Sequence, residues 1–236
     1  MRDEGYSTVG VIGGMGPEAT LDFFAKILAS TPAAIDQDHI HLIIDNNPKV
    51  PDRNKAVAGV GPSPAPVLAA MARRLEHAGA DFLVMPCNAA HAFQSAIETA
   101  VSIPFVSIIE ATCDEVVRRF PAVKCAGVLA STGCLDAELY QTAFARCGIA
   151  VVVPVAAERD AFMQLVYRIK SGEKAHLFAA GMRDIAEALV DRGAEVLVAG
   201  CTEVSLVLGE KDAPRPLVDS TAVLVRATIQ RVRAGA

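Results

Sequence analysis

The length, composition and charge of the chain exclude several classes of protein. Its 236 residues are enough for one large domain or two small ones with a substantial core. The 52% of hydrophobic and 21% of charged residues are typical of a folded globular protein rather than a disordered one. The net charge of −5 argues against general binding of nucleic acid, because no basic surface could replace the counterions of a phosphate backbone. Small molecules are therefore the expected partners.

The N-terminus and the cysteines indicate the compartment. Residues 1–7 carry charges but are followed by no apolar segment of the kind found in secretory signals, and no uninterrupted apolar run is long enough to span a bilayer. The six cysteines have neither a CxxC pair nor the dense spacing of a disulfide-stabilised protein. The sequence therefore predicts a cytoplasmic protein with reduced thiols and no membrane contact.

The first half of the chain is predicted to alternate strands and helices. Residues 9–12 form an apolar run that ends in a glycine turn at 13–16, and Pro17 begins a segment with apolar residues at helical spacing. A polar loop at 45–54 lies at the kind of strand end where α/β proteins carry chemistry. Further strands are expected at 39–44, 82–85 and 103–108, and further helices from the loop at 59–66 up to residue 77 and at 88–100.

The second half repeats this rhythm, which predicts the fold class. Strands that alternate with helices indicate a parallel sheet in each half. The predicted fold is therefore α/β, with two pseudo-symmetric Rossmann-like domains and an active-site cleft between them. We expect one domain to comprise residues 1–108 and 214–236, and the other residues 109–213. The expected elements are strands at 126–129, 149–153, 196–199 and 216–218, helices at 135–146, 161–170 and 175–192, and a terminal helix capped by residues 219–220.

Two stretches of the chain repeat one another. A glycine, an alanine, an acidic residue and an apolar run lead to Cys87 over residues 79–87, and the same order leads to Cys201 over residues 193–201, at a distance of 114 residues. The strand and turn that begin near Gly10 recur from Gly127, at a distance of 117 residues. Such self-similarity is the mark of a structural unit used twice. The two cysteines would then approach one site from opposite sides.

The repeated cysteines carry the predicted chemistry. Each follows a buried strand and opens a helix, where unpaired N–H groups favour the thiolate and bring the pKa of a thiol toward neutral. Two such thiols could remove a proton from one face of a carbon atom and deliver a proton to the opposite face, without a metal or a cofactor. The alternative is that both cysteines are structural residues at tight strand ends.

Four short segments resemble those of a known family. They read GGMGPEAT from residue 13, NPKVPDR from residue 47, PCNAAH from residue 86 and GCTE from residue 200. In this order, and over almost the whole chain, they resemble the signature segments of the aspartate/glutamate racemase family, in particular its aspartate racemase branch. The resemblance implies two Rossmann-like halves, cofactor-independent racemisation by a cysteine pair, and a homodimer.

The resemblance also implies roles for individual residues. Cys87 and Cys201 match the two catalytic thiols. Arg53 and Lys170 would hold the side-chain carboxylate of a small acidic amino acid, for which arginine offers a two-pronged donor. Ala89 stands where the family usually has threonine, so a backbone N–H would bind the substrate there instead of a hydroxyl. The complete set of residues expected to bind substrate is Met15, Arg53, Asn88, Ala89, Thr132, Lys170 and Thr202.

Other interpretations of the same residues are open. The fold would also suit a diacid isomerase or decarboxylase of the same superfamily, or a protein that binds an acidic amino acid without turnover. The glycines at 13–16 formally fit a dinucleotide-binding turn, but Pro17 occupies the helix start and no acidic residue follows at the usual spacing. Cys87 and His91 could share a helix face and bind a metal or act together, but no third ligand has suitable spacing. We expect His91 to cap its helix or to form a hydrogen bond within it, and we expect neither a metal nor a cofactor.

Overall fold

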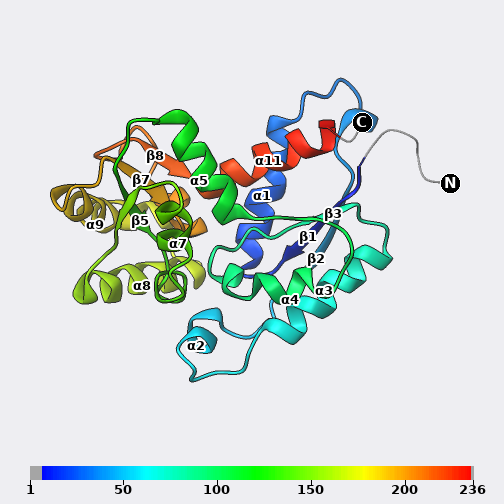
Figure 1. Cartoon of the computed structure of the whole chain (residues 1–236), viewed down its shortest axis with the longest axis horizontal. Coiled ribbons are helices and arrows are strands. Elements are labelled where there is room, and N and C mark those ends of the chain that lie inside the picture. The colour runs from blue at the N-terminus through cyan, green and yellow to red at the C-terminus, as the bar shows by residue number, and fades with distance from the viewer. Residues whose placement is uncertain (1–6, 235–236) are drawn as a thin grey trace.

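The computed structural model describes residues 7–234 and contains two four-stranded parallel sheets, one in each lobe of Figure 1. In strand order, the first sheet consists of β2 (Leu42–Asn46), β1 (Val9–Gly13), β3 (Phe82–Val84) and β4 (Phe105–Val106). The second consists of β6 (Ala150–Val152), β5 (Cys125–Leu129), β7 (Val196–Ala199) and β8 (Leu217–Asp219). The predicted α/β fold with two similar halves is confirmed.

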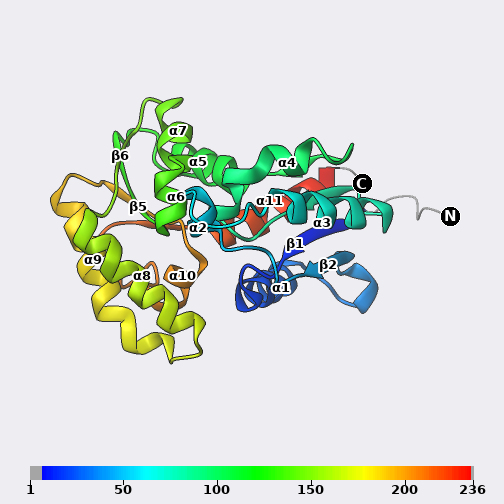
Figure 2. The ribbon, with the colours of Figure 1, turned by 90° about the horizontal axis from the view of Figure 1, so that it is seen from below.

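Helices connect the strands and pack around both sheets (Figures 1 and 2). No helix of residues 7–234 is both long enough and apolar enough to cross a membrane. The α-helices are α1 (Pro17–Ser30), α2 (Arg53–Val57), α3 (Ala65–His77), α4 (Gln94–Glu98), α5 (Ile108–Arg119), α6 (Thr132–Asp136), α7 (Leu139–Ala145), α8 (Ala156–Lys170), α9 (Ala179–Asp191), α10 (Thr202–Val207) and α11 (Ser220–Ala234), and the short 3₁₀ helices are η1 (Asp36–Asp38), η2 (Ala89–Phe93) and η3 (Ala175–Phe178).

The internal repeat is present in three dimensions. β1 to β4 and β5 to β8 have the same order within their sheets, so β3 corresponds to β7. Gly10 on β1 pairs with Leu83 on β3, and Gly127 on β5 pairs with Leu197 on β7. A Cβ atom would lie 2.6 Å from the Leu83 side chain if added to Gly10, and 2.9 Å from the Leu197 side chain if added to Gly127. The repeated glycines therefore allow the same close packing in both halves.

Helix α11 packs against elements of both halves. The largest core cluster contains residues of both sheets, together with residues of α5 and α11. α11 leaves the second sheet and packs on α1 of the first half and on α5 (Figure 1). The predicted first domain includes residues 214–236. In the structure, however, β8 pairs with β7 of the second sheet. β8 completes its sheet as β4 completes the other, so only α11 returns to the first half.

Some element boundaries in the first half differ from the predictions. Helix α5 is absent from the sequence prediction, and it begins at Ile108, so the strand expected at 103–108 is reduced to β4. The hydroxyl of Ser107 caps α5 by accepting a hydrogen bond from the N–H of Glu110. Helix α2 begins inside the predicted polar loop and extends beyond it, because the Asp52 side chain caps it. The second strand is shifted to β2, and the helix expected at 88–100 consists of η2 and α4.

The helices of the second half also differ in their bounds. The helix expected at 135–146 is interrupted between α6 and α7, where Glu138 has a left-handed backbone with φ of 51°. Helix α8 begins at Ala156, five residues early, because Glu158 accepts a hydrogen bond from the N–H of Val155. The helix expected at 175–192 consists of η3 and α9, and α10 is an addition to the prediction.

We expect Gly127→Ala to lower the free energy of unfolding by about 1–3 kcal/mol, because the added methyl group would overlap buried side chains. Gly181→Ala is the matched control. A Cβ atom there would lie 3.4 Å from Leu165, and Gly181 is within α9, so this change should be neutral or stabilise by up to about 1 kcal/mol. Urea denaturation measures both, and equal stability of the two variants would contradict the close packing at Gly127.

Candidate active site

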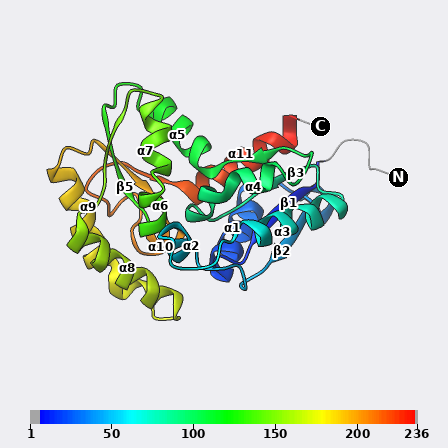
Figure 3. The ribbon, with the colours of Figure 1, turned by 60° about the horizontal axis from the view of Figure 1, so that its bottom comes forward.

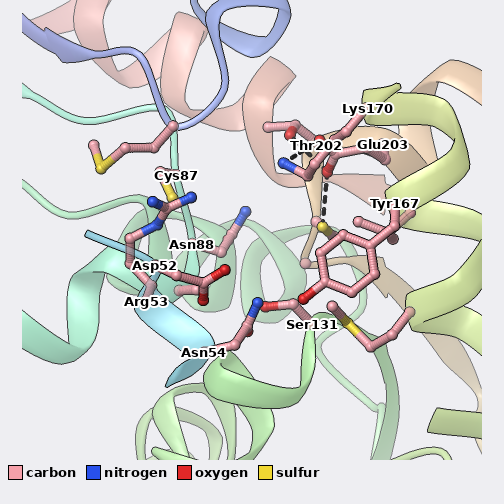
Figure 4. Close-up of a pocket in the computed structure, with 16 residues that line it drawn as sticks. Asp52, Arg53, Asn54, Cys87, Asn88, Ser131, Tyr167, Lys170, Thr202 and Glu203 are labelled. Atoms are coloured by element: carbon pink, nitrogen blue, oxygen red, sulfur yellow. Dashed lines mark hydrogen bonds and ion pairs between the residues drawn. The ribbon is translucent and has the colours of Figure 1, made fainter. Parts of the chain in front are cut away.

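A pocket between the two halves collects polar side chains at the carboxyl ends of the strands (Figure 4). Its empty volume is about 550 Å³, including the open mouth. Both repeated cysteines reach it, one from each half. The first half contributes Met15, Asp52, Arg53, Asn54, Cys87, Asn88 and Ala89, and the second contributes Ser131, Met163, Val166, Tyr167, Lys170, Gly200, Cys201, Thr202 and Glu203.

The ring of His91 holds the backbone of Cys87 at the end of β3. Nδ1 of His91 lies 2.9 Å from the carbonyl oxygen of Cys87, and Nε2 accepts a 3.1 Å hydrogen bond from the N–H of Ile108 at the start of α5. This network places the ring proton on Nδ1, which donates to Cys87. Burial lowers the pKa of His91 to about 4, so the ring is neutral at pH 7. Both ring nitrogens bond to backbone groups rather than to the Cys87 thiol. The bond to Cys87 is local, whereas the bond to Ile108 reaches a different helix.

The described residues do not provide a set of ligands for the metal site that Cys87 and His91 suggested. Among residues 7–234, no three or more His, Cys, Asp or Glu side chains are placed together so that they could hold a metal ion. All six cysteines are free thiols.

Asn88 is buried and connects elements of both halves. Its Oδ1 accepts a 2.6 Å hydrogen bond from the hydroxyl of Tyr140 on α7, and its Nδ2 donates to Oγ of Ser220 at 3.2 Å. The Ser220 hydroxyl donates in turn to the carbonyl oxygen of Ala199 at the end of β7, at 2.7 Å. Burial raises the pKa of Tyr140 well above its ordinary value, so its hydroxyl stays a donor. One N–H of the Asn88 amide is left for a ligand.

Cys201 has a carboxylate partner. Its thiol donates to Oε2 of Glu203 at 2.9 Å, and Oε1 of Glu203 lies 2.7 Å from Nζ of Lys170 on α8 (Figure 4). Burial and the Glu203 carboxylate raise the pKa of Cys201 well above its ordinary value, although the charge of Lys170 opposes them. The expectation that a helix start favours the thiolate is therefore wrong for Cys201, because burial and an adjacent negative charge outweigh the nearby N–H groups.

The Lys170–Glu203 pair is ionised. Burial is the largest single effect on each group and disfavours its charge, but the attraction between the two groups and the other charges and hydrogen bonds around them together outweigh it. The pKa of Lys170 is consequently raised above its ordinary value and that of Glu203 is lowered. The carboxylate beside Cys201 thus keeps its negative charge at neutral pH.

Helix α2 carries polar residues of the first half to the pocket and touches the second half. Oδ1 of Asn54 accepts a 2.8 Å hydrogen bond from the N–H of Gly133 in α6, and Figures 2 and 3 show α2 beside α6. Nη1 of Arg53 donates to the carbonyl oxygens of Val50 and Pro51 at 3.2 and 3.0 Å. The Arg53 guanidinium is therefore anchored to its own loop while it lines the pocket.

Eight of the nine predicted site residues line this pocket, and Thr132 does not. Thr132 begins α6, where its N–H is directed at the sulfur of Met163 at 3.5 Å, and its neighbour Ser131 lines the pocket instead. Glu203 is part of the GCTE segment that carries the family resemblance, but the sequence analysis assigned it no function. Met163, Val166 and Tyr167 precede Lys170 on α8 by three to seven residues, a spacing that could have indicated one helix face. The lining residues missed by the sequence are Asp52, Asn54, Ser131, Met163, Val166, Tyr167, Gly200 and Glu203.

Known proteins share this sequence pattern over most of the chain. The pattern of the Asp/Glu/hydantoin racemase family matches residues 12–228. A broad-specificity amino-acid racemase of Bacillus subtilis (strain 168) is 28% identical over 225 residues, which are 94% of this chain and 96% of that protein.

Solved structures share the fold. The aspartate racemase of Picrophilus torridus superposes with a TM-score of 0.84 and 27% identity, over 96% of this chain and 94% of that one. An aspartate racemase homologue from Pyrococcus horikoshii OT3 gives a TM-score of 0.76 and 24% identity, over 96% of this chain and 99% of that one. The two-lobed architecture is thus common to all three chains.

The buried His91 predicts how stability depends on pH. The pKa of its ring is about 4 in the folded chain against 6.5 for an ordinary histidine, so the unfolded chain binds the proton more readily between these values. The free energy of unfolding should therefore fall by about 3 kcal/mol from this residue as the pH drops from above 6.5 toward 4. Urea denaturation at several pH values measures this fall.

The matched variants are His91→Asn and His176→Asn, the latter at an exposed histidine. His91→Asn should be less stable at pH 7, because it weakens the acceptor for the Ile108 N–H, but its stability should change less between pH 6.5 and 4. His176→Asn should keep the wild-type dependence. The same dependence in all three proteins would show that His91 is not the group responsible.

Proposed function

The chain belongs to the Asp/Glu/hydantoin racemase family, and on this premise we propose that it interconverts L- and D-aspartate, or the two forms of glutamate, without a cofactor. The observation that carries the proposal is the position of Cys87 and Cys201. They follow the equivalent strands β3 and β7 of a duplicated fold, and they line one pocket from opposite halves. A substrate bound between them would present one face of its α-carbon to each sulfur.

The reaction needs one thiolate and one thiol. The thiolate takes the α-proton, the electrons of the broken C–H bond spread into the adjacent carboxylate, and the other thiol delivers its proton to the opposite face of the α-carbon. The product is the mirror-image amino acid. The developing negative charge is stabilised by cationic side chains and N–H groups that are already oriented toward the pocket.

The remaining predicted residues bind the substrate. Arg53 forms no ion pair with another described residue, and its free N–H groups are suited to a carboxylate. Lys170 uses one of three donors on Glu203 and has others for the same substrate carboxylate. The Thr202 hydroxyl donates to Glu203 and can accept from the α-ammonium group. The remaining amide N–H of Asn88 and the backbone of Ala89 bind the α-carboxylate, and Met15 forms the floor.

The activity is tested in heavy water with L-aspartate and, separately, L-glutamate. We expect loss of optical rotation together with the uptake of one α-deuterium. Cys87→Ser and Cys201→Ser should each lower kcat at least about a hundredfold, because each removes one partner of the proton transfer. Cys147→Ser, at an exposed thiol, is the matched control and should leave kcat unchanged.

The outcomes separate the alternatives. Deuterium uptake that survives in both cysteine variants would overturn the two-thiol mechanism. A product other than the mirror-image amino acid, followed by NMR, would favour a diacid isomerase or decarboxylase. Binding of either acid by calorimetry without exchange at the α-carbon would favour a binding protein.

We also propose that the protein is a cytoplasmic homodimer, whose chains meet along α1. Leu21, Phe24 and Leu28 lie on one face of this helix with 36% to 67% of their surface exposed. Ile44 on the edge strand β2 lines a shallow apolar groove together with Leu21 and Phe24. A twofold axis would place this strip against its own copy, which is the geometry of most homodimers.

The proposed cytoplasmic location rests on the cysteines, because free thiols suit the reducing cytoplasm.

Sedimentation velocity tests this interface. The double variant Leu21→Glu/Leu28→Glu should convert the dimer to a monomer, because it brings like charges together in a contact that is otherwise apolar. Leu177→Glu is the matched control, at a leucine with 63% exposure on η3, and should remain dimeric. A monomeric wild-type protein, or a double variant that stays dimeric, would rule out this interface.

A further inference from the structure

The two halves of the duplicated fold differ in the residues that directly follow the two cysteines. Cys87, Asn88 and Ala89 occupy the positions in the first half that Cys201, Thr202 and Glu203 occupy in the second, each at a distance of 114 residues. Glu203 therefore corresponds to Ala89, which has no group that could accept a proton or carry a charge. Of the two equivalent thiols, only Cys201 has a carboxylate in this place.

The carboxylate is fixed in position and charged. Glu203 is only 5% exposed. Oε2 accepts hydrogen bonds from the Cys201 thiol at 2.9 Å and the Thr202 hydroxyl at 3.1 Å, while Oε1 faces Nζ of Lys170 at 2.7 Å. All the oxygen atoms of this buried carboxylate thus have partners, and the thiol is one of them. A thiolate at Cys201 would lose this bond and face a negative charge.

Cys87 has different surroundings. Among residues 7–234, no hydrogen bond to its thiol is found, although its backbone carbonyl is held by His91. Asp52, which caps α2, Arg53 on α2 and Tyr167 on α8 line the same pocket, but within the described chain none of them forms a hydrogen bond or ion pair with either thiol. The charged groups that act on Cys201 are therefore Glu203 and Lys170.

We propose that Glu203, held in its ionised form by Lys170, keeps the proton on Cys201 and so makes Cys201 the proton donor and Cys87 the acceptor in the resting site. This inference rests on the proposed racemase function. Glu203 is a positioning residue, since it acts on the substrate only through the Cys201 thiol. The resting form reacts with the enantiomer whose α-hydrogen faces Cys87, and the form with the proton on Cys87 reacts with the other enantiomer.

The proton balance follows from this assignment. Cys87 gains the α-proton as the C–H bond breaks, and Cys201 loses its proton as the new C–H bond forms on the other face. The protein is left with a Cys87 thiol and a Cys201 thiolate next to Glu203. To return to the resting form, Cys87 gives a proton to water and Cys201 takes one. The repulsion between the Cys201 thiolate and Glu203 drives this return.

Alkylation of the two thiols with iodoacetamide tests the proposal without any racemase assay, because only thiolates react. The rate at each cysteine is followed by mass spectrometry of peptides as a function of pH. In the wild-type protein, the pH midpoint for Cys201 should lie above the value of about 8.5 for an ordinary thiol. In Glu203→Gln the midpoint should fall, so that alkylation of Cys201 at pH 8 is at least about tenfold faster, while Cys87 is unchanged.

Two further variants make the test specific. Glu203→Asp keeps the charge and should keep the high midpoint of Cys201. Glu187→Gln, at an exposed glutamate of α9, should behave as the wild type. A wild-type midpoint at or below the ordinary thiol value would overturn the proposal even if no Glu203 variant folds, and so would an unchanged midpoint in a folded Glu203→Gln protein.

The turnover measurement separates this proposal from the proposed function. If the protein racemises an acidic amino acid, Glu203→Gln should change kcat/KM by the same factor for both enantiomers and shift the pH dependence of kcat. If the protein racemises neither acid but the Cys201 midpoint responds to Glu203 as expected, the substrate assignment fails while the role of Glu203 in holding the proton stands.

Discussion

The pocket depends on a buried chain of hydrogen bonds that fixes two strand ends relative to each other. Asn88 follows β3, Ala199 ends β7, and Ser220 bridges them, while Tyr140 satisfies the other end of the Asn88 amide. A buried polar group that loses its partner costs about 1–3 kcal/mol, so each member of this chain restrains the others. Cys87 directly precedes Asn88, and Cys201 lies two residues beyond Ala199. The relative position of the two thiols is thus set by groups that mostly face away from the pocket.

The sequence predicts the parts of this architecture that depend on local constraints. A glycine is needed at Gly10 and at Gly127 because the leucine side chain of the neighbouring strand leaves no room for a Cβ atom. The same constraint acts in both halves, so the glycine is present in both. The buried strands β3 and β7 are short apolar runs, and parallel strands place their carboxyl ends at one edge of a sheet. The two cysteines follow these runs, which is why their meeting in one pocket could be predicted.

The parts that the sequence did not predict depend on contacts between distant segments. Lys170 lies 33 residues before Glu203, and nothing local indicates that its amino group is paired with a carboxylate. The bond from Gly133 to Asn54 exists only because α2 and α6 meet across the pocket. The expectation of a thiolate at Cys201 used a local rule about helix starts. It was wrong because the folded chain buries the thiol and places the Glu203 carboxylate beside it, and both raise its pKa.

A racemase connects two molecules of equal free energy, so no residue of its site can shift the equilibrium between them. The ratio kcat/KM must be the same for both enantiomers, whatever surrounds each cysteine. A site built from two identical halves would still need one of its two cysteines as a thiol and the other as a thiolate. The shared proton would then be found on either sulfur with equal frequency. Glu203, opposite Ala89 in the repeat, removes this degeneracy without altering the overall equilibrium. The asymmetry therefore decides which sulfur carries the proton in the resting state and in the return of the proton between turnovers, while the ratio of kcat/KM between the two enantiomers stays fixed.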